Sequence, residues 1–274
     1  MFNLDGKTII ITGASSGIGA ATAIALASHH TNLVLAARRT DKLEQVAGEC
    51  KAGGAREVVA LRCDVSQRAD VENIVQAAVR KFGRLDVMIA NAGYGFLAKI
   101  HETTEQQFDD IMATNVKGTW YAMQTAAEVM LKQPPLGGRK KDARGHIIAV
   151  SSGAGKRGMP LYGLYSMTKA AQLSLAQAMR VELMGEGIYV STVHPLTTAT
   201  EFFEVASSKS RLKSRGLGHA QDVSVVARKM VRLIQRPHPE LWPVFGSNLL
   251  LTLGCLFPTL ADRSMARTVL RRKR

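Results

Sequence analysis

Tyr165 and Lys169 are the residues of this sequence whose types and spacing best suit proton transfer. They stand four positions apart in the run Tyr-Ser-Met-Thr-Lys, so on a helix they share one face. An ammonium group near a phenol favours the phenolate and lowers the tyrosine pKa from about 10 toward neutrality. The pair therefore predicts a general acid and base at Tyr165, although the same spacing also occurs on solvated helices.

The length and composition of the chain favour a single α/β domain. It has 274 residues, of which 46% are hydrophobic and 21% charged, so it can bury a large core. Short apolar runs rich in β-branched residues alternate with helical patterns. This alternation predicts a doubly wound parallel sheet of the Rossmann type with helices on both faces. Ligands bind at the carboxyl ends of the strands in such sheets.

The predicted elements follow one another without a long linker. We expect strands at residues 7–12, 32–37, 57–62, 85–90, 146–151 and 188–193. We expect helices at residues 18–28, 41–51, 69–81, 105–131 and 164–184. Residues 1–240 are predicted to form a nucleotide-binding and catalytic domain, followed at 241–274 by an apolar and then basic C-terminal extension.

A glycine-rich turn joins the first predicted strand to the first predicted helix. The run Thr-Gly-Ala-Ser-Ser-Gly-Ile-Gly starts at position 12 and leaves backbone amides and the positive helix end open to a pyrophosphate. The alternative is a turn that serves only tight packing between strand and helix. We expect cofactor contacts from Gly13, Ser15, Ser16, Gly17, Ile18 and Gly19.

Two arginines follow the second predicted strand, where a cofactor with a free 2′-hydroxyl would favour a carboxylate. Arg38 and Arg39 suit a 2′-phosphate instead, which predicts NADP over NAD; the alternative is a pair of solvated loop cations. After the third strand, Asp64 precedes Val65 and is predicted to accept a hydrogen bond from the adenine amino group. It could instead cap the helix that begins near Ser66.

Together these residues resemble the short-chain dehydrogenase/reductase family over residues 5 to about 236. The signs, in the order and spacing of the family, are the glycine turn, Asn91-Ala92-Gly93, Asn115, Ser152, and Tyr165 with Lys169. The resemblance implies a nicotinamide cofactor and a catalytic tetrad of Asn115, Ser152, Tyr165 and Lys169. It implies further cofactor contacts from Asn91, Ala92, Gly93, Tyr165, Lys169, Pro195, Thr198 and Thr200.

The implied chemistry is hydride transfer between nicotinamide and a carbonyl carbon, coupled to proton transfer at the carbonyl oxygen. Ser152 would hold that oxygen, Tyr165 would exchange its proton, and Lys169 would tune Tyr165 and bind the nicotinamide ribose. The resemblance also implies a water on the Asn115 backbone that relays protons to Lys169. Leu196 departs from the family pattern, which has glycine after the proline at 195, so the backbone path there stays open.

Apolar residues near the tyrosine and after the sixth strand predict a hydrophobic substrate such as a lipid, steroid or retinoid. The predicted substrate-binding residues are Ser152, Met159, Leu161, Tyr162, Tyr165, Phe202 and Phe203. Residues 197–218 are predicted to form a mobile lid. Two alternatives remain open: a 3-oxoacyl thioester reductase whose basic lid meets an acidic carrier protein, and a non-catalytic NADP-binding scaffold at a membrane surface.

The C-terminal segment carries most of the net charge. Lys and Arg exceed Asp and Glu by 14 overall and by 11 within residues 207–274. Residues 241–261 are uncharged and precede a basic run, which is typical of a peripheral contact with an anionic membrane. Pro243 and Pro258 argue against a simple spanning helix. The alternative is a last strand with a lid or subunit contact and a solvated tail.

The remaining predictions concern metals, partners and location. The seven histidines show no metal-ligand spacing, so no metal is expected, and no nucleic-acid partner is expected. Three well-separated cysteines and the lack of a secretory pattern at the N-terminus predict a cytoplasmic location, peripheral on a membrane if the C-terminal contact exists. The resemblance implies a homodimer or homotetramer assembled through helices 105–131 and 164–184.

Overall fold

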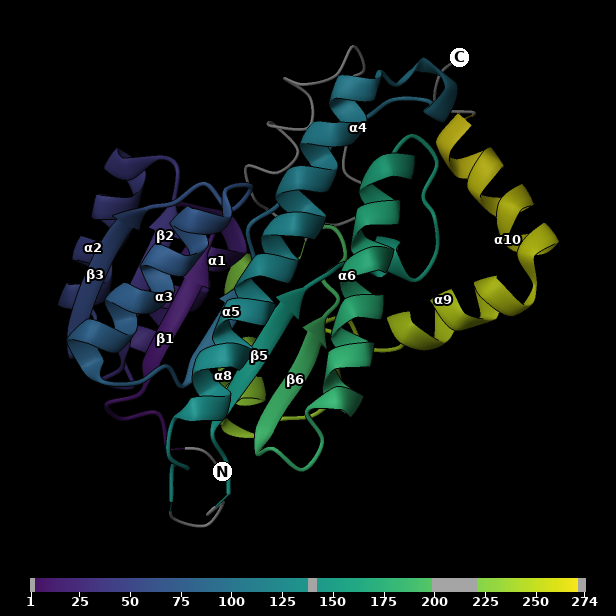
Figure 1. The fold of residues 1–274 in the computed structure, drawn as a ribbon. Coiled ribbons are helices and arrows are strands. Elements are labelled where there is room, and N and C mark those ends of the chain that lie inside the picture. Colours follow the sequence, from purple (N-terminus) through teal and green to yellow (C-terminus); the bar gives the residue numbers. More distant parts are fainter. Residues whose placement is uncertain (1–2, 138–141, 199–220, 271–274) are drawn as a thin grey trace.

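The computed structural model describes residues 3–137, 142–198 and 221–270 (Figure 1). Within them, parallel strands form one sheet in the order β3-β2-β1-β4-β5-β6-β7. The strands are β1 (Thr8–Thr12), β2 (Asn32–Ala37), β3 (Glu57–Arg62), β4 (Val87–Ala90), β5 (Gly145–Val150), β6 (Ile188–Val193) and β7 (Glu240–Leu241). The predicted doubly wound parallel sheet is confirmed.

Helices cover both faces of this sheet (Figure 1). One face packs against α1 (Gly17–Ala27), α2 (Thr40–Ala52) and α8 (Val223–Gln235). The other face packs against α3 (Arg68–Phe82), α5 (Gly118–Lys132) and α6 (Gly163–Glu182). Helix α4 (Glu105–Ile111) precedes α5, and α9 (Ser247–Leu256) and α10 (Pro258–Met265) follow β7. Short helical turns lie at Ile100–Glu102, Met112–Lys117, Gly153–Gly155 and Ala266–Leu270.

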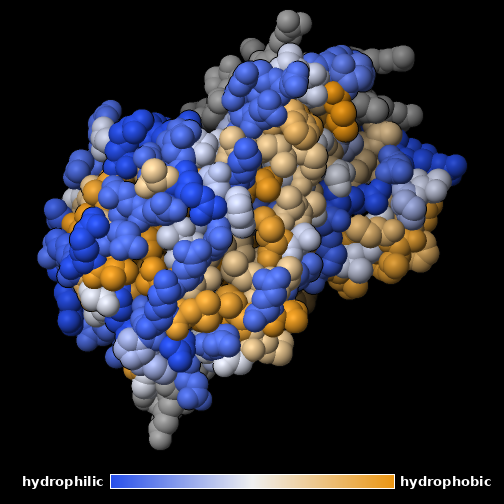
Figure 2. Space-filling view, viewed as in Figure 1, coloured by the Kyte–Doolittle hydropathy of each residue, from blue (hydrophilic) through white to orange (hydrophobic). Residues whose placement is uncertain are grey.

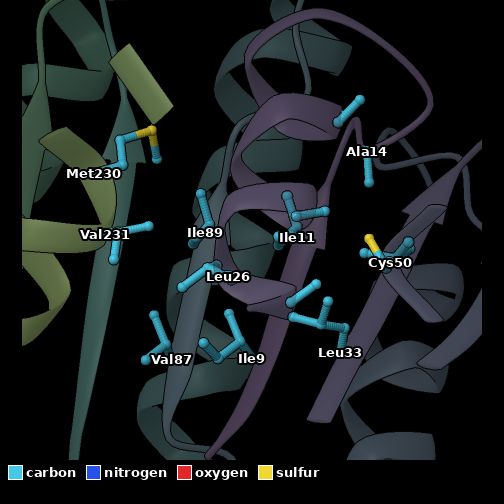
Figure 3. Close-up of a cluster of buried hydrophobic side chains, with 14 of the residues drawn as sticks. Ile9, Ile11, Ala14, Leu26, Leu33, Cys50, Val87, Ile89, Met230 and Val231 are labelled. Atoms are coloured by element: carbon cyan, nitrogen blue, oxygen red, sulfur yellow. The ribbon is translucent and has the colours of Figure 1, made fainter. Parts of the chain in front are cut away.

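The strands are mostly apolar because the sheet is covered by helices on both faces. Successive side chains of a strand point to opposite faces of the sheet. Ile9 and Ile11 of β1 therefore join the core under α1, α2 and α8, whereas Ile10 joins the core under α3, α5 and α6. Figure 3 shows the first of these cores, where Leu26 of α1 and Met230 of α8 lie over the strands.

The strand order reverses between β1 and β4, because β2 pairs on one side of β1 and β4 on the other. Loops leave such a point in opposite directions and open a crevice at the carboxyl ends of the strands. Hydrogen bonds fix its walls: the Thr12 hydroxyl oxygen accepts from the backbone N–H groups of Asn91 at 3.0 Å and Ala92 at 3.1 Å. The Asn91 side chain donates to the Thr12 carbonyl at 2.9 Å. The fold thus holds the glycine turn against the loop after β4.

Several elements differ from the sequence predictions. The helix expected at residues 105–131 contains a π-helical turn at Met112–Lys117, between α4 and α5. The amphipathic helix α8 was not predicted, although Asp222 caps it by accepting from the Ser224 N–H at 2.8 Å. The position after residue 240, where the sequence analysis separates the C-terminal extension, lies within β7, and the division of the chain at this point stays a prediction.

Candidate active site

A cavity of about 590 Å³ lies at the carboxyl ends of the strands. Its walls include the residues that directly follow β1 through β6, namely Gly13, Arg38, Cys63, Asn91, Ser151 and, one residue later, Pro195. This volume is typical of small-molecule sites. The sequence placed the chemistry at this edge of the sheet, and the cavity lies there.

The glycine turn forms one end of the cavity. Gly13 and Gly17 have φ angles of +67° and +57°, a region that favours glycine. A Cβ on Gly13 would lie 2.8 Å from the Cα of Ala92, and one on Gly19 would collide with the Gly13 carbonyl. Gly19 therefore provides close packing and does not line the cavity, whereas Gly13, Gly17 and Ile18 do.

A positively charged corner lies beside this turn. The Arg39 guanidinium donates to the hydroxyls of Ser15 at 3.3 Å and Ser16 at 2.6 Å. Ser16 is the N-cap residue of α1, but its side chain makes no capping hydrogen bond to the helix. The exposed Arg38 lines the same part of the cavity. The start of α1 and two guanidinium groups thus form a corner suited to phosphate.

Asp64 lines the cavity and also stabilises a turn. Its carboxylate accepts from the Ser66 N–H at 3.0 Å and the Ser66 hydroxyl at 2.8 Å. Burial raises the pKa of Asp64, but these hydrogen bonds and the charges of Arg38 and Arg62 together bring the pKa below its ordinary value. Asp64 therefore supports the turn ahead of α3, which begins at Arg68, and the adenine contact stays a prediction.

Ser152 and Tyr165 meet at the other end of the cavity. Ser152 follows β5, and its hydroxyl oxygen accepts from the Ala154 N–H at 3.1 Å. Burial raises the pKa of Tyr165 to about 12, while a hydrogen bond with the Ser152 side chain acts in the opposite direction. Burial outweighs the hydrogen bond in this structure, and the lowering of the Tyr165 pKa expected from Lys169 stays a prediction.

Lys169 is 4% exposed and has neutral hydrogen-bond partners. Its ammonium donates to the Val150 carbonyl at 2.8 Å and to the Gln172 side-chain oxygen at 2.9 Å. It lies 5.6 Å from the centroid of the Tyr165 ring. Burial lowers the pKa of Lys169 to about 7. Lys169, rather than Tyr165, is therefore the member of the pair whose pKa lies near neutrality.

The two neighbouring serines after β5 have different roles. The Ser151 hydroxyl donates to the backbone carbonyl of Lys169 at 2.7 Å, which fastens the end of β5 to α6. Gly155 supports the same contact, since a Cβ there would lie 2.7 Å from the Lys169 carbonyl. Ser152 is the serine that bonds Tyr165, in agreement with the choice made from spacing.

Asn115 is fully buried and lies outside the cavity lining. Its side chain accepts from the Tyr94 N–H at 3.0 Å and donates to the Tyr94 carbonyl at 2.9 Å and the Thr168 hydroxyl at 3.0 Å. Its backbone carbonyl accepts from the Gln172 amide at 2.7 Å. The carbonyl that was expected to hold a water is therefore linked to Lys169 by the side chain of Gln172.

The cavity brings together most of the residues predicted from the sequence. Those that line it are Gly13, Ser15, Ser16, Gly17, Ile18, Arg38, Arg39, Asp64, Val65, Asn91, Ala92, Gly93, Ser152, Met159, Tyr162, Tyr165, Lys169, Pro195 and Thr198. Thr200, Phe202 and Phe203 lie outside the described residues, as does nearly all of the predicted lid. Leu161 does not line the cavity: its φ angle is +69°, and its carbonyl accepts from the Ala98 N–H at 2.9 Å.

The loop after β6 accommodates leucine where the family pattern has glycine. Within the described residues, the non-glycine positions with positive φ are His30 and Leu161, so the backbone at Leu196 is not in the left-handed region. The Pro195 carbonyl accepts from the Gly153 N–H at 3.0 Å, and Leu196 lines the cavity. A Cβ on Gly153 would collide with Leu196. Gly153 therefore provides the space that Leu196 fills.

Leu251 and Gln172 are two of the residues at this site that sequence reasoning missed. Leu251 of α9 lines the cavity, although it is 82 positions from Lys169 and nothing in its spacing links it to the tetrad. Gln172 bonds Lys169, and the signal that could have found it is its place one helical turn after that residue.

The pKa of Lys169 leads to a prediction about stability. An unfolded lysine has a pKa near 10.5, whereas the folded value is about 7. Between these values the unfolded state binds more protons, so the free energy of unfolding should rise with pH from about 7 to about 10, by up to about 1.4 kcal/mol per pH unit. Urea unfolding at pH 7, 8 and 9 checks this rise. Lys169→Met should remove the part of this rise that comes from Lys169, whereas the exposed control Lys132→Met should keep it. Equal slopes of the unfolding free energy against pH in all three proteins would contradict a lowered pKa at Lys169.

The sequence matches known relatives over most of its length. The model of the short chain dehydrogenase family matches residues 7–211. Glycine betaine reductase of Emericella nidulans is 32% identical over 85% of this chain, although the match spans only 18% of that protein. Sorbitol dehydrogenase of Cereibacter sphaeroides is 35% identical over 75% of this chain and 76% of its own. 11-beta-hydroxysteroid dehydrogenase-like 4A of Arabidopsis thaliana is 39% identical over 70% of this chain and 61% of its own.

Two solved structures that share the fold contain nicotinamide cofactors. A short chain dehydrogenase/reductase from Burkholderia phymatum in complex with NAD has a TM-score of 0.82 and 26% identity, covering 95% of this chain and 97% of that chain. An alcohol dehydrogenase from Thermococcus sibiricus complexed with 5-hydroxy-NADP has a TM-score of 0.74 and 27% identity, covering 87% and 96%. With the cavity and the ordered motifs, these matches show that the chain belongs to the short-chain dehydrogenase/reductase family and is an NAD(P)-dependent oxidoreductase.

Proposed function

We propose that this protein is an NADP(H)-dependent oxidoreductase that acts on the carbonyl or alcohol carbon of a hydrophobic substrate, with Tyr165 as general acid and base. The observation that carries the proposal is the meeting of Ser152 and Tyr165 beside the buried Lys169, in the cavity that also holds the glycine turn. A proton donor at one end of a phosphate-binding crevice is what carbonyl reduction by a nicotinamide requires.

The residues present fit a dinucleotide. Gly13 lets the loop after β4 approach the glycine turn closely, and α1 begins at the cavity with Arg38 and Arg39 beside it. When bound there, a reduced nicotinamide supplies the hydride. Gly13, Ser15 and Gly17 would hold the pyrophosphate, Asp64 and Val65 the adenine, and Lys169 the ribose next to the nicotinamide. Asn91, Ala92, Gly93, Pro195, Thr198 and Thr200 complete the proposed cofactor contacts.

The protein's own residues then manage charge and protons at the substrate oxygen. The Ser152 hydroxyl holds the carbonyl oxygen as it gains charge. With a pKa near 12, Tyr165 carries its proton at neutral pH and is therefore prepared to donate it during reduction. Lys169, with a pKa near 7, can return a proton to Tyr165. Asn115 acts through its hydrogen bonds to Tyr94 and Thr168, which position the loop after β4 against α6.

The 2′-phosphate is proposed from the two arginines. Arg39 bonds the hydroxyls beside the glycine turn, and the charge of Arg38 helps to lower the pKa of Asp64 nearby. No carboxylate directly follows β2 to bind a free 2′-hydroxyl. Solved relatives bind NAD or an NADP derivative, so the proposed preference for NADP over NAD rests on these arginines.

A hydrophobic substrate is proposed because apolar side chains line the end of the cavity near Tyr165. Met159, Tyr162, Leu196 and Leu251 contribute there. The names of the relatives include a sugar alcohol dehydrogenase and a hydroxysteroid dehydrogenase-like protein, so family membership leaves the substrate open. A 3-oxoacyl thioester reductase remains the second enzyme candidate. A non-catalytic scaffold is disfavoured, because it would need neither Tyr165 nor Lys169.

We also propose self-association through the long helices, as the family resemblance implied. Exposed apolar side chains lie on α5, at Trp120 and Leu131, and on α6, at Met167 and Val181. Figure 2 shows apolar surface over these helices. The choice between a dimer and a tetramer, and the cytoplasmic location, stay predictions.

A second apolar surface, the C-terminal patch, lies on α9, α10 and the residues that directly precede each helix. It consists of the exposed side chains of Phe245, Leu249, Leu250, Leu253, Leu256, Phe257 and Leu260. Figure 2 shows these helices at the right, with hydrophobic surface over α9 and hydrophilic surface along α10. Among the described residues, no helix is both long and apolar enough to cross a bilayer.

We propose that the C-terminal patch lies on an anionic bilayer. Exposed Arg263 and Arg267 follow it, and the sequence ends in four further basic residues, whereas Asp262 is paired with Arg157 at 2.6 Å. This positive charge complements an anionic lipid surface and opposes a second copy of the same patch. Because Leu251 on the same helix lines the cavity, docking would bring the site close to a lipid-borne substrate.

Replacement of Tyr165 by phenylalanine tests the catalytic role. A panel of hydrophobic ketones followed by NADPH absorbance should identify a substrate of the unaltered protein. Tyr165→Phe should lower kcat/KM at least about a thousandfold, because the proton donor is lost, while the Kd for NADPH stays within about twofold. Tyr189→Phe on β6 is the control and should retain turnover. Turnover unchanged in Tyr165→Phe would refute the mechanism.

Replacement of Arg38 by alanine tests the cofactor preference. Loss of a charge-assisted hydrogen bond to the 2′-phosphate should raise the Kd for NADPH about tenfold or more and leave the Kd for NADH nearly unchanged. Titration by cofactor fluorescence measures both constants. Arg56→Ala removes an exposed arginine that pairs with Asp5, and serves as control. If the Kd values for NADPH and NADH rise equally in Arg38→Ala, the proposed preference for NADP loses its support.

Vesicle flotation of the full chain tests the membrane contact. Vesicles of phosphatidylcholine with phosphatidylglycerol should bind the protein, and vesicles of phosphatidylcholine alone should bind it about tenfold less. The triple change Leu249→Ser, Leu250→Ser and Leu256→Ser should lower binding at least about tenfold. Met184→Ser, at an exposed position just after the end of α6, is the control. Binding that is equal in the triple variant, or a smaller oligomer of that variant in light scattering, would reject the bilayer as the occupant.

A further inference from the structure

Gln172 is a fully buried amide that neither the glycine turn nor the tetrad accounts for. It lies on α6 one turn after Lys169, so the two side chains share a face of the helix. Its oxygen accepts from the Lys169 ammonium at 2.9 Å. Its nitrogen donates to the Asn115 carbonyl at 2.7 Å and to the Thr119 hydroxyl at 2.7 Å.

These three partners allow the amide one orientation. An ammonium group can only donate, so the amide oxygen must face Lys169. A backbone carbonyl can only accept, so the amide nitrogen must face Asn115. Reversal of the amide would leave two buried polar groups without partners and bring like groups together. The Lys169 ammonium and the Asn115 carbonyl therefore fix the orientation of the Gln172 amide from its two sides.

The amide also joins two elements that meet only in the folded protein. Asn115 lies in the π-helical turn and Thr119 in the first turn of α5, whereas Lys169 lies on α6. π-Helical turns of this kind are frequent at functional sites. A second bond, from the Asn115 side chain to the Thr168 hydroxyl at 3.0 Å, holds the same two elements together. Lys169 is thus supported from outside its own helix.

We propose that Gln172 is a positioning residue that holds Lys169 for proton transfer and directly links it to the Asn115 carbonyl. The proposal rests on the assigned role of Lys169 in the proposed function. The resemblance to the family implied a water at this link, and here a side chain of the protein makes it. A covalently attached amide fixes the ammonium more rigidly than an exchangeable water, but it has no ionisable group of its own to relay a proton.

The neutrality of Gln172 has a consequence for the charge of Lys169. The neighbours of the ammonium are the Val150 carbonyl at the end of β5, Gln172 on the same helix, and Tyr165 as the titratable group. A carboxylate at position 172 would favour the charged lysine strongly. An apolar side chain there would favour the neutral amine. The amide lies between these limits and leaves Lys169 able to gain and lose a proton near neutral pH.

NMR of lysine side chains in the full chain tests the proposal without the need for turnover. The signal of Lys169 is assigned by its loss in Lys169→Arg, and its titration is followed in the presence and absence of NADPH. Gln172→Glu should raise the apparent pKa of Lys169 by at least about one unit, and Gln172→Met should lower it. Gln177→Glu, an exposed change on the same helix, should leave it unchanged.

Activity gives the second readout. In reduction, the basic limb of the kcat profile should move to higher pH in Gln172→Glu and to lower pH in Gln172→Met, with kcat at pH 7 reduced about tenfold or more in the latter. If one variant does not fold by circular dichroism, the other still decides the direction of the shift. An unchanged Lys169 titration in a folded variant would overturn the proposal. Absence of turnover in the unaltered protein would instead count against the proposed function, so the two failures are distinguishable.

Discussion

The burial of the Lys169 ammonium is the constraint on which the site depends. A cation in the interior is stable only when its hydrogen bonds are satisfied, and here neutral acceptors satisfy them. The end of β5 provides the Val150 carbonyl, Ser151 binds the carbonyl of Lys169, and Gly155 allows the close approach. Burial lowers the pKa of Lys169 to about 7, and the partners, which are dipoles rather than anions, do not offset this effect. The charge of Lys169 can therefore change during a reaction at neutral pH.

The fold places a positively charged, phosphate-binding corner at the end of the cavity opposite Lys169. The reversal of strand order between β1 and β4 opens the crevice, and Thr12 and Asn91 fix its walls. The start of α1 and Arg39 make one end positive, while Lys169 and Tyr165 form the other. A dinucleotide has its phosphates at one end and its reactive ring at the other, so it suits a cavity with these two ends. The order of the strands therefore places the phosphate-binding corner and the proton-transfer residues in one crevice.

Much of this arrangement was predictable because parallel strands buried on both faces leave a clear record in the sequence. The six strands and the glycine turn follow from apolar runs and glycine placement, whereas the meeting of Ser152 with Tyr165 was implied by the family resemblance. The effect of burial on the pKa of Tyr165 could not be predicted, because spacing says nothing of how deeply a phenol is buried. Leu251 was missed because its contact crosses from α9 to the cavity, and such a tertiary contact leaves no local pattern. The spacing of Gln172 from Lys169 shows that the two share a helix face, but it does not show the bond of Gln172 to the Asn115 carbonyl in the π-helical turn.

The central claim is that Tyr165 transfers a proton in the same step in which the substrate carbon receives hydride. Kinetic isotope effects measure this most directly, with NADPH deuterated at the transferred position and turnover compared in H₂O and D₂O. The account predicts a primary effect of the deuterated cofactor and a solvent effect on the same step, so that each persists when the other isotope is present. A primary cofactor effect with no solvent effect would contradict it, because the proton would then move in a separate step.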